Sequence, residues 1–186
     1  MRLVIAYRRL IVYEYDLQQR PTVDIRPEID VSMNFISAPD LAGNMNLRMH
    51  GTSIMTKEDF NSLAQGRICL AAQLSDDLII GFCWLAFGDI YVSEIDTIRK
   101  LSPEEANIFN LRVLPEYRRK GISKAILSAA CQYLKEKGFR KVSIEASSTN
   151  YASRRAIERV GFKETGALVF WRLLWIKHHR EEWVSA

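Results

Sequence analysis

The spacing of apolar residues changes between two periods along the chain. Over Gly121–Lys137 apolar residues recur every three or four positions, which predicts a helix with one apolar face. The flanking segments Glu104–Val113 and Lys141–Ala146 are short, apolar or alternating runs of the kind that form strands. A strand, a helix and a strand within 43 residues predict a βαβ unit whose two strands are parallel.

The other segments predict further strands and helices. Leu3–Leu17 is expected to form one long strand or a strand pair, and its charged positions indicate a sheet edge. Residues 1–28 are interpreted as an N-terminal strand addition followed by a connector, which carries two prolines and several charges. Trp171, Leu173 and Trp175 alternate along the last predicted strand, which predicts a row facing the core. Additional strands are expected over 29–36, 68–73, 78–87, 162–165 and 168–176, with Gly166 in a turn, and helices over 39–66 and 150–160.

Composition predicts one globular domain over residues 1–186. Hydrophobic residues make up 48% of the chain, which excludes a disordered protein. Cys69, Cys83 and Cys131 follow neither metal-site nor disulfide spacing, so we expect reduced core residues in a cytoplasmic protein. We see no signal peptide, and no apolar run reaches the ~20 residues of a membrane helix, so no membrane association is expected.

Positive charge is concentrated in the second half of the chain. Residues 1–100 carry 10 Lys and Arg against 13 Asp and Glu, whereas residues 101–186 carry 16 against 9. This asymmetry suits an anionic ligand. Nucleic acid is one such anion, but no nucleic-acid-binding motif accompanies the charge, so we do not expect nucleic acid as a partner.

A basic turn, Arg118-Arg119-Lys120-Gly121, leads from a predicted strand into the predicted helix. Pro115 ends the strand pairing because proline has no N–H to donate to a ladder. The amides of such a turn and of the following helix N-terminus point at one spot, where they can bind a phosphate group. An isolated turn of this composition is more often a solvated loop, so its interpretation depends on the residues downstream.

These residues resemble the acyl-coenzyme A signature of the GNAT acetyltransferase superfamily. That signature is Arg or Gln, two residues, Gly, one residue, then Gly or Ala; Arg118 and Gly121 fit it, whereas Ser123 departs from it. Asn150, twelve residues before Phe162 of a Gly-Phe pair, resembles the second motif of the superfamily. The resemblance covers residues 109–163 and implies an α/β (α+β) GNAT-like fold: a central mixed, mostly antiparallel sheet, a parallel βαβ pair splayed at the cofactor cleft, and helices on both faces.

The resemblance also implies acetyl-CoA as the co-substrate, with no metal. The strand before the turn would pair with the pantetheine arm, and the turn would bind the pyrophosphate. Asn150 would contact the cofactor arm, although capping a helix explains this residue equally well and both roles can coexist. The implied cofactor-binding residues are Leu111, Arg112, Val113, Arg118, Arg119, Lys120, Gly121, Ile122, Ser123, Lys124, Asn150 and Ser153.

Acetyl transfer to an amine needs a group that takes the proton of the amine, and Glu145 is our candidate base. It lies on the predicted strand opposite the apolar residues and resembles a glutamate of family members that acetylate protein N-termini. A plain surface glutamate is an equally good interpretation, and Glu105 is the second candidate. Asn150 is the other implied catalytic residue. Many relatives have a Tyr seven residues after this Asn, which acts as the acid toward the departing thiolate, whereas this chain has Ile157. The thiolate would then leave without a side-chain acid or take its proton from another donor.

The function implied by the resemblance is transfer of acetyl from acetyl-CoA to a primary amine, by a monomer or a homodimer. The acceptor would be a protein N-terminus or a small molecule, and nothing in the sequence decides between them. The departure at Ile157 leaves open a second class, a GNAT fold that binds acyl-CoA or a partner without turnover. Binding of RNA or DNA by the basic half is a third, weaker interpretation.

Overall fold

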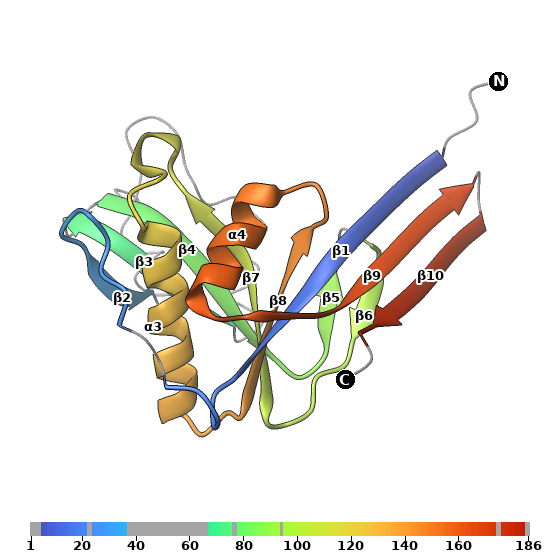
Figure 1. Cartoon of the computed structure of the whole chain (residues 1–186), viewed down its shortest axis with the longest axis horizontal. Helices are drawn as coiled ribbons and strands as arrows, with labels where there is room; N and C mark the ends of the chain where they lie inside the picture. The colour runs from blue at the N-terminus through green and yellow to red at the C-terminus, as the bar shows by residue number, and fades with distance from the viewer. Residues whose placement is uncertain are drawn as a thin grey trace.

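The computed structural model describes residues 5–21, 24–36, 67–75, 78–93, 95–173 and 176–184. Within these ranges the chain forms an eight-stranded sheet, a separate two-stranded ribbon and two α-helices (Figure 1). The helices expected over residues 39–66 lie outside the described residues. The elements are β1 (Ile5–Asp16), β2 (Ser32–Ile36), β3 (Ile68–Ser75), β4 (Leu78–Phe87), β5 (Ile90–Val92), β6 (Thr97–Arg99), β7 (Glu105–Val113), the 3-10 turn η1 (Pro115–Tyr117), α3 (Ile122–Glu136), β8 (Lys141–Ser147), α4 (Tyr151–Val160), β9 (Lys163–Leu173) and β10 (Ile176–Trp183).

The large sheet has the strand order β10-β9-β1-β8-β7-β4-β3-β2. Its β7 and β8 are parallel, and the other neighbouring pairs among the described strands are antiparallel. Because α3 connects β7 to β8, the predicted βαβ unit is present. The expected mixed, mostly antiparallel sheet with one parallel pair is therefore confirmed.

The N-terminal strand β1 lies inside the sheet, so its predicted position at an edge is wrong. It pairs with β8 along one side and with β9 along the other. The charges that suggested an edge have cross-strand partners instead: Arg9 pairs with Glu182 of β10, and Glu14 lies 3.4 Å from the ammonium of Lys141. Glu14 and Lys141 lie on adjacent strands, whereas Arg9 reaches past β9 to β10. In both cases the opposite charges attract each other, which makes charged side chains compatible with an interior strand.

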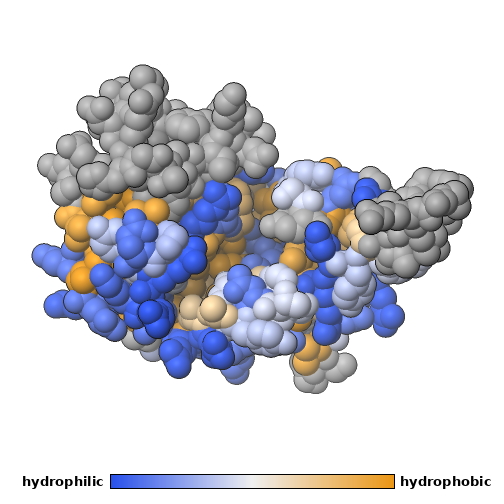
Figure 2. Space-filling model, turned by 90° about the horizontal axis from the view of Figure 1, so that it is seen from above, coloured by the Kyte–Doolittle hydropathy of each residue, from blue (hydrophilic) through white to orange (hydrophobic). Residues whose placement is uncertain are grey.

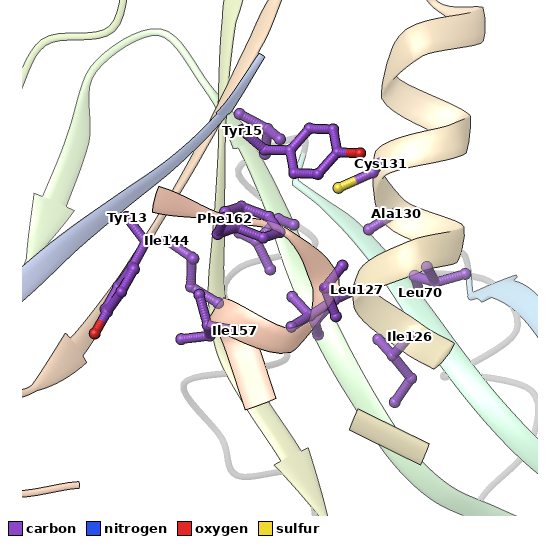
Figure 3. Close-up of a cluster of buried hydrophobic side chains, with 14 of the residues drawn as sticks. Tyr13, Tyr15, Leu70, Ile126, Leu127, Ala130, Cys131, Ile144, Ile157 and Phe162 are labelled. Carbon is purple, nitrogen blue, oxygen red and sulfur yellow. The ribbon is translucent and has the colours of Figure 1, made fainter. Parts of the chain in front are cut away.

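Both described helices, α3 and α4, pack on the same face of the sheet (Figure 1). Their apolar faces pack against Tyr13 of β1, Ile144 of β8 and Phe162, which lies between α4 and β9 (Figure 3). Cys131 of α3 lies in this core, and burial raises the pKa of its thiol to about 12, so it is not a nucleophile at neutral pH. All three cysteines are free and buried, which confirms their predicted role as core residues.

The opposite face of the sheet is partly covered by the ribbon of β5 and β6. Ile90, Val92 and Ile95 of the ribbon region pack with Leu10 and Val12 of β1. This apolar contact fixes the ribbon against the sheet. It also brings the end of β6 over β8, where the polar cluster described below is found.

The C-terminal region differs from the prediction in two ways. β9 continues through Gly166, where a turn was expected, and pairs with β10, a strand that was not predicted. A Cβ at Gly166 would collide with the carbonyl of Glu182, so the glycine permits close approach of two strands. Trp171 is 37% exposed, and its ring lies 5.1 Å from that of His178 in a tilted arrangement, so its predicted core position is wrong. Figure 1 shows this end of the sheet extending past both described helices. Trp175 lies outside the described residues.

Candidate active site

Strands β7 and β8 are paired over only part of their length. Their parallel register ends where Ile108 lies opposite Ile144. Beyond that point the register of β7 with β4 shifts, and Asn110 takes a left-handed conformation with a φ of 53°. Figure 1 shows the two strands separating toward their C-terminal ends, so the predicted splayed pair is confirmed. A bulge of this kind bends one strand away from its neighbour.

The end of the sheet at which β7 and β8 separate is hollowed. Figure 2, which looks down on this end, shows a hollow with an apolar floor between polar rims. Leu111, Arg112 and Val113 follow the bulge on β7, and the side chain of Val113 is buried. The ladder with β8 ends before these residues, so they do not pair with β8.

The turn after β7 has the geometry of an anion-binding site. Arg119 and Gly121 both have positive φ values, 65° and 80°, and Gly121 is the N-cap of α3. The amides of residues 122–124 open the helix and so have no acceptor within it. No described backbone group accepts from them either. These amides, the helix dipole and the adjacent cations concentrate positive potential at one point.

Two cations of the turn are held in place by their neighbours. The Nε of Arg118 donates to the carbonyl of Val113 at 3.1 Å, which ties the turn to the end of β7. The ammonium of Lys120 lies 5.2 Å from the ring centroid of Tyr117, within the range of a cation–π contact. The turn is therefore ordered by contacts within the chain.

Residues 24–31 support the turn from outside. The amide of Glu28 donates to the carbonyl of Lys120 at 3.0 Å. A Cβ at Gly121 would lie 3.4 Å from the Cα of Pro27, so Gly121 permits both its left-handed conformation and this contact. A half-open cavity of about 470 Å³ lies between this loop and α3. No residue of β7 or β8 lines the cavity. The cavity is therefore separate from the place beyond Ile108 and Ile144 at which β7 and β8 separate, which is called the divergence below.

Asn150 and Ser153 lie at the C-terminal end of β8, the end that carries the divergence. The Oδ1 of Asn150 accepts from the Ser153 amide at 3.2 Å and caps α4. The capping interpretation of Asn150 is thus confirmed. The residue is exposed, so its cap does not bury it away from a ligand.

Glu145 is the first residue of β8 after the last rung with β7, and it lies in a buried polar cluster. Its carboxylate forms an ion pair with Arg99 of β6, and the two side chains are 9% and 12% exposed. The Nδ2 of Asn107, on β7, lies 3.1 Å from Oε1 and 2.9 Å from Oε2 of Glu145. The hydroxyl of Ser143 joins the cluster, 3.1 Å from Nη1 of Arg99. Glu145 is therefore held in place and is not a plain surface glutamate.

Glu105, the second candidate base, lies at the closed end of the same strand pair. It is opposite Lys141, forms an ion pair with it, and accepts from the Ser102 amide at 3.1 Å. Burial by itself raises the pKa of Glu105, but the hydrogen bonds from Lys141 and Ser102 outweigh it, and the pKa is lowered overall. Because Glu105 has a lowered pKa and lies at the opposite end of the strand pair from the divergence, it is a poorer candidate base than Glu145.

Two residues of the polar cluster, Asn107 and Arg99, were not predicted from the sequence. Asn107 lies between apolar Ala106 and Ile108, opposite Ser143 on the predicted parallel strand, and that pairing could have identified it. Arg99 lies outside the strands and helices that the sequence predicts. No local pattern there indicates that its side chain reaches β8.

Ile157 of α4, at the position where many relatives have Tyr, is fully buried on the side of the helix that faces the core. Tyr151 is 63% exposed. The hydroxyl of Tyr13 donates to Glu158 at 2.9 Å and accepts from Nε of Arg154 at 2.8 Å. Burial raises the pKa of Tyr13, so this phenol stays neutral at physiological pH.

Neither α3 nor α4, the α-helices of the described residues, has the length and apolar composition of a membrane-spanning segment. No group of three or more His, Cys, Asp or Glu in these residues is placed to hold a metal ion.

A parallel strand pair that separates beside a cationic, glycine-capped helix N-terminus offers a binding site for a ligand that carries phosphate. The model of the acetyltransferase (GNAT) family matches residues 44–162, and the chain belongs to this family. A solved structure of a GCN5-related N-acetyltransferase from Sphaerobacter thermophilus has a TM-score of 0.61 and 16% identity, covering 96% of this chain and 53% of that one. An aminoglycoside N-acetyltransferase in complex with CoA has a TM-score of 0.51 and 23% identity, covering 72% and 92%.

Two curated relatives match shorter segments. The aminoglycoside N(6')-acetyltransferase type 1 of Salmonella typhimurium is 29% identical over 99 residues, which cover 53% of this chain and 65% of the relative. The [ribosomal protein bS18]-alanine N-acetyltransferase of Escherichia coli is 33% identical over 61 residues, which cover 33% of this chain and 41% of the relative. The chain thus spans less than two thirds of either relative.

Proposed function

We propose that this chain is an N-acetyltransferase that transfers acetyl from acetyl-CoA to a primary amine. The observation that carries the proposal is the position of the turn: its two left-handed residues, Arg119 and Gly121, follow the strand that has just separated from β8. In acyl-CoA the pantetheine arm joins the pyrophosphate, which would lie at the turn, to the thioester, which would lie at the divergence. Membership of the acetyltransferase family supports the same chemistry.

In this proposal the turn binds the pyrophosphate of acetyl-CoA. The amides of Arg119 to Lys124, including those of Ile122 and Ser123, and the charges of Arg118 and Lys120 face the phosphates, while Gly121 leaves room for them. Leu111, Arg112 and Val113 pair with the amides of the pantetheine arm along the open part of β7. Asn150 and Ser153 approach the arm from the start of α4. No metal is required.

The chemical step is a direct attack of the amine nitrogen on the thioester carbonyl. The C–N bond forms, the C–S bond breaks, and coenzyme A leaves as a thiolate that takes up the proton which the attacking nitrogen loses on becoming an amide. The ammonium form of the acceptor must first lose a proton, which passes to Glu145 directly or through a water molecule. Glu145 suits this role because Asn107 and Arg99 fix its carboxylate beside the divergence.

The acceptor belongs to one of two chemical classes. One relative is named for the N(6') position of an aminoglycoside, and another for an alanine of ribosomal protein bS18. We propose a primary amine without choosing between them. The alternative is a protein that binds acyl-CoA without turnover, which the buried Ile157 supports because no phenol stands at that position on α4.

The test is a thiol-release assay with acetyl-CoA over a panel of amines. The panel contains an aminoglycoside, a polyamine and a peptide with a free N-terminal alanine, and mass spectrometry detects the acetylated product. We expect one class to give acetylated product in equal amount to the released thiol. Binding of acetyl-CoA without product from any class would favour the non-catalytic alternative, and absence of binding would overturn both.

A further inference from the structure

The ion pair between Arg99 and Glu145 joins two parts of the structure that are separate in the sheet. Arg99 ends β6, in the two-stranded ribbon, whereas Glu145 belongs to the eight-stranded sheet. Nη1 of Arg99 donates to the Glu145 carboxylate and, at 3.1 Å, to the hydroxyl of Ser143. One guanidinium therefore contacts both Ser143 and Glu145, which are neighbouring residues on the same face of β8.

Stability alone does not account for this pair. Taking two charges out of water costs free energy that their attraction only partly returns, so a buried ion pair rarely adds net stability. The apolar contacts of Ile90 and Ile95 already attach the ribbon to the sheet. The ion pair also lies at a particular place, one residue beyond the last rung that joins β7 to β8.

Charged groups from each neighbouring strand surround the pair. Glu14 of β1 lies 3.9 Å from Nη2 of Arg99, so the guanidinium stands between two carboxylates. Lys141 of β8 approaches Glu14 at 3.4 Å and pairs with Glu105 of β7. Of these two cations, Lys141 contacts Glu14 and Glu105, whereas Arg99 contacts Glu145.

We propose that Arg99 is a positioning residue for acetyl transfer, which orients the Glu145 carboxylate toward the divergence and keeps it in its charged, proton-accepting form. This inference rests on the proposed function. During the reaction Arg99 stays protonated and forms or breaks no covalent bond. Its guanidinium and the Asn107 amide hold two sides of the carboxylate, so the proton of the acceptor ammonium arrives at a base of fixed orientation.

Removing the cation changes both properties of Glu145. Without Arg99 the carboxylate stays in a poorly solvated site near Glu14, and a carboxyl group in such surroundings binds a proton more readily. The base is then lost at the lower end of the working pH range. The orientation of the carboxylate also relaxes, since the ion pair no longer restrains it and the bonds from the Asn107 amide hold it from one side.

The experiment compares three variants with the parent in acetyl transfer to its best amine. Arg99→Gln is expected to lower kcat by about 10- to 100-fold, in the range that misplaced catalytic groups cause. The KM for acetyl-CoA should stay close to that of the parent, and the acidic limb of the pH–rate profile should move to higher pH. Arg99→Lys should recover part of the rate and the profile. Lys141→Met, the control, removes the other cation of the network and should leave the profile unchanged.

The inference is overturned if Arg99→Gln and Lys141→Met lower the rate equally with the profile of the parent, because Arg99 would then be a structural residue. A second readout does not depend on turnover. With ¹³C-labelled glutamate side chains, assigned by Glu145→Gln, the Glu145 carboxyl resonance should change at higher pH in Arg99→Gln than in the parent. An unchanged resonance overturns the inference, whereas a shifted resonance in a protein that acetylates no amine overturns only the proposed function.

Discussion

The side-chain amide of Asn107 lies 2.9 Å from Oε2 of Glu145, across the point at which β7 and β8 stop pairing. The same amide lies 3.1 Å from the hydroxyl of Ser143. Asn107 therefore continues the connection between the two strands by side-chain hydrogen bonds after the backbone ladder has ended. Because Asn107 is 1% exposed, these bonds are made away from bulk water, where an unpaired amide would be costly.

Glu145→Gln keeps the shape of the side chain and removes the proton acceptor. If Glu145 takes the proton of the amine, turnover should fall by about 10²–10⁴, while the affinity for acetyl-CoA stays nearly unchanged. Raising the pH should partly rescue the variant, because more of the acceptor amine is then already neutral. Steady-state kinetics over a range of pH, with calorimetry for the cofactor, measures both quantities.

This substitution also leaves Arg99 without its anionic partner, so stability must be measured beside activity. Breaking a buried pair by removing one partner costs about 3–5 kcal/mol, which urea unfolding detects. Glu14→Gln is the matched control, because Glu14 also approaches Arg99 but is not at the divergence. A folded Glu145→Gln protein with the rate and pH profile of the parent would show that Glu145 is not the base.

Ile157→Tyr tests whether the position of the missing phenol could still hold one. Ile157 is 0% exposed and packed in the core, so the larger polar ring should cost about 1–3 kcal/mol by overpacking, with no gain in rate. Urea unfolding and the thiol-release rate measure the two effects. Ile157→Val, which should cost only about 0.5–1.5 kcal/mol, controls for packing. A faster and equally stable tyrosine variant would mean that an acid slot is present.

The Lys141–Glu105 pair predicts a stability difference that depends on pH. Hydrogen bonding to Lys141 and Ser102 lowers the pKa of Glu105 below 4.5, so its contribution is present above the unfolded-state pKa and lost as pH falls through the folded-state pKa. Lys141→Met should therefore cost about 0.5–1 kcal/mol at pH 7, as for a partly exposed pair, and less in acid. Urea unfolding at pH 7 and near pH 3 measures the difference, with exposed Lys100→Met as control. A cost that is equal at both pH values would contradict the assignment.

Local sequence patterns predicted the central βαβ unit because its signals are short-range. The apolar period of α3, the glycine at its start and Pro115 after β7 all act within a few residues. The cap of α4 by Asn150 is local for the same reason. These features shape the turn that we propose binds acetyl-CoA, and so the geometry of that turn could be predicted.

The rest of the site depends on partners distant in the chain. The position of β1 was wrong because strand order is set by pairing with β8 and β9, and charges on β1 are neutralised by β10 and β8. Arg99 reaches Glu145 across 46 positions of the sequence. Gly166 was interpreted as a turn, although the glycine is required by the approach of Glu182 from β10. Such contacts leave no periodic signal.

The central claim is that the turn at Gly121 binds the pyrophosphate of acetyl-CoA, and calorimetric titration of two glycine variants tests it most directly. Gly121→Asp places a side chain and a negative charge at the proposed phosphate position. Gly138→Asp is the matched control: its φ of 87° resembles the 80° of Gly121, it lies just beyond the other end of α3, and a Cβ there meets nothing within 4 Å. We predict that Gly138→Asp binds acetyl-CoA like the parent and that folded Gly121→Asp shows no binding. Undiminished binding by Gly121→Asp would contradict the account, because the phosphate site would then have to lie elsewhere.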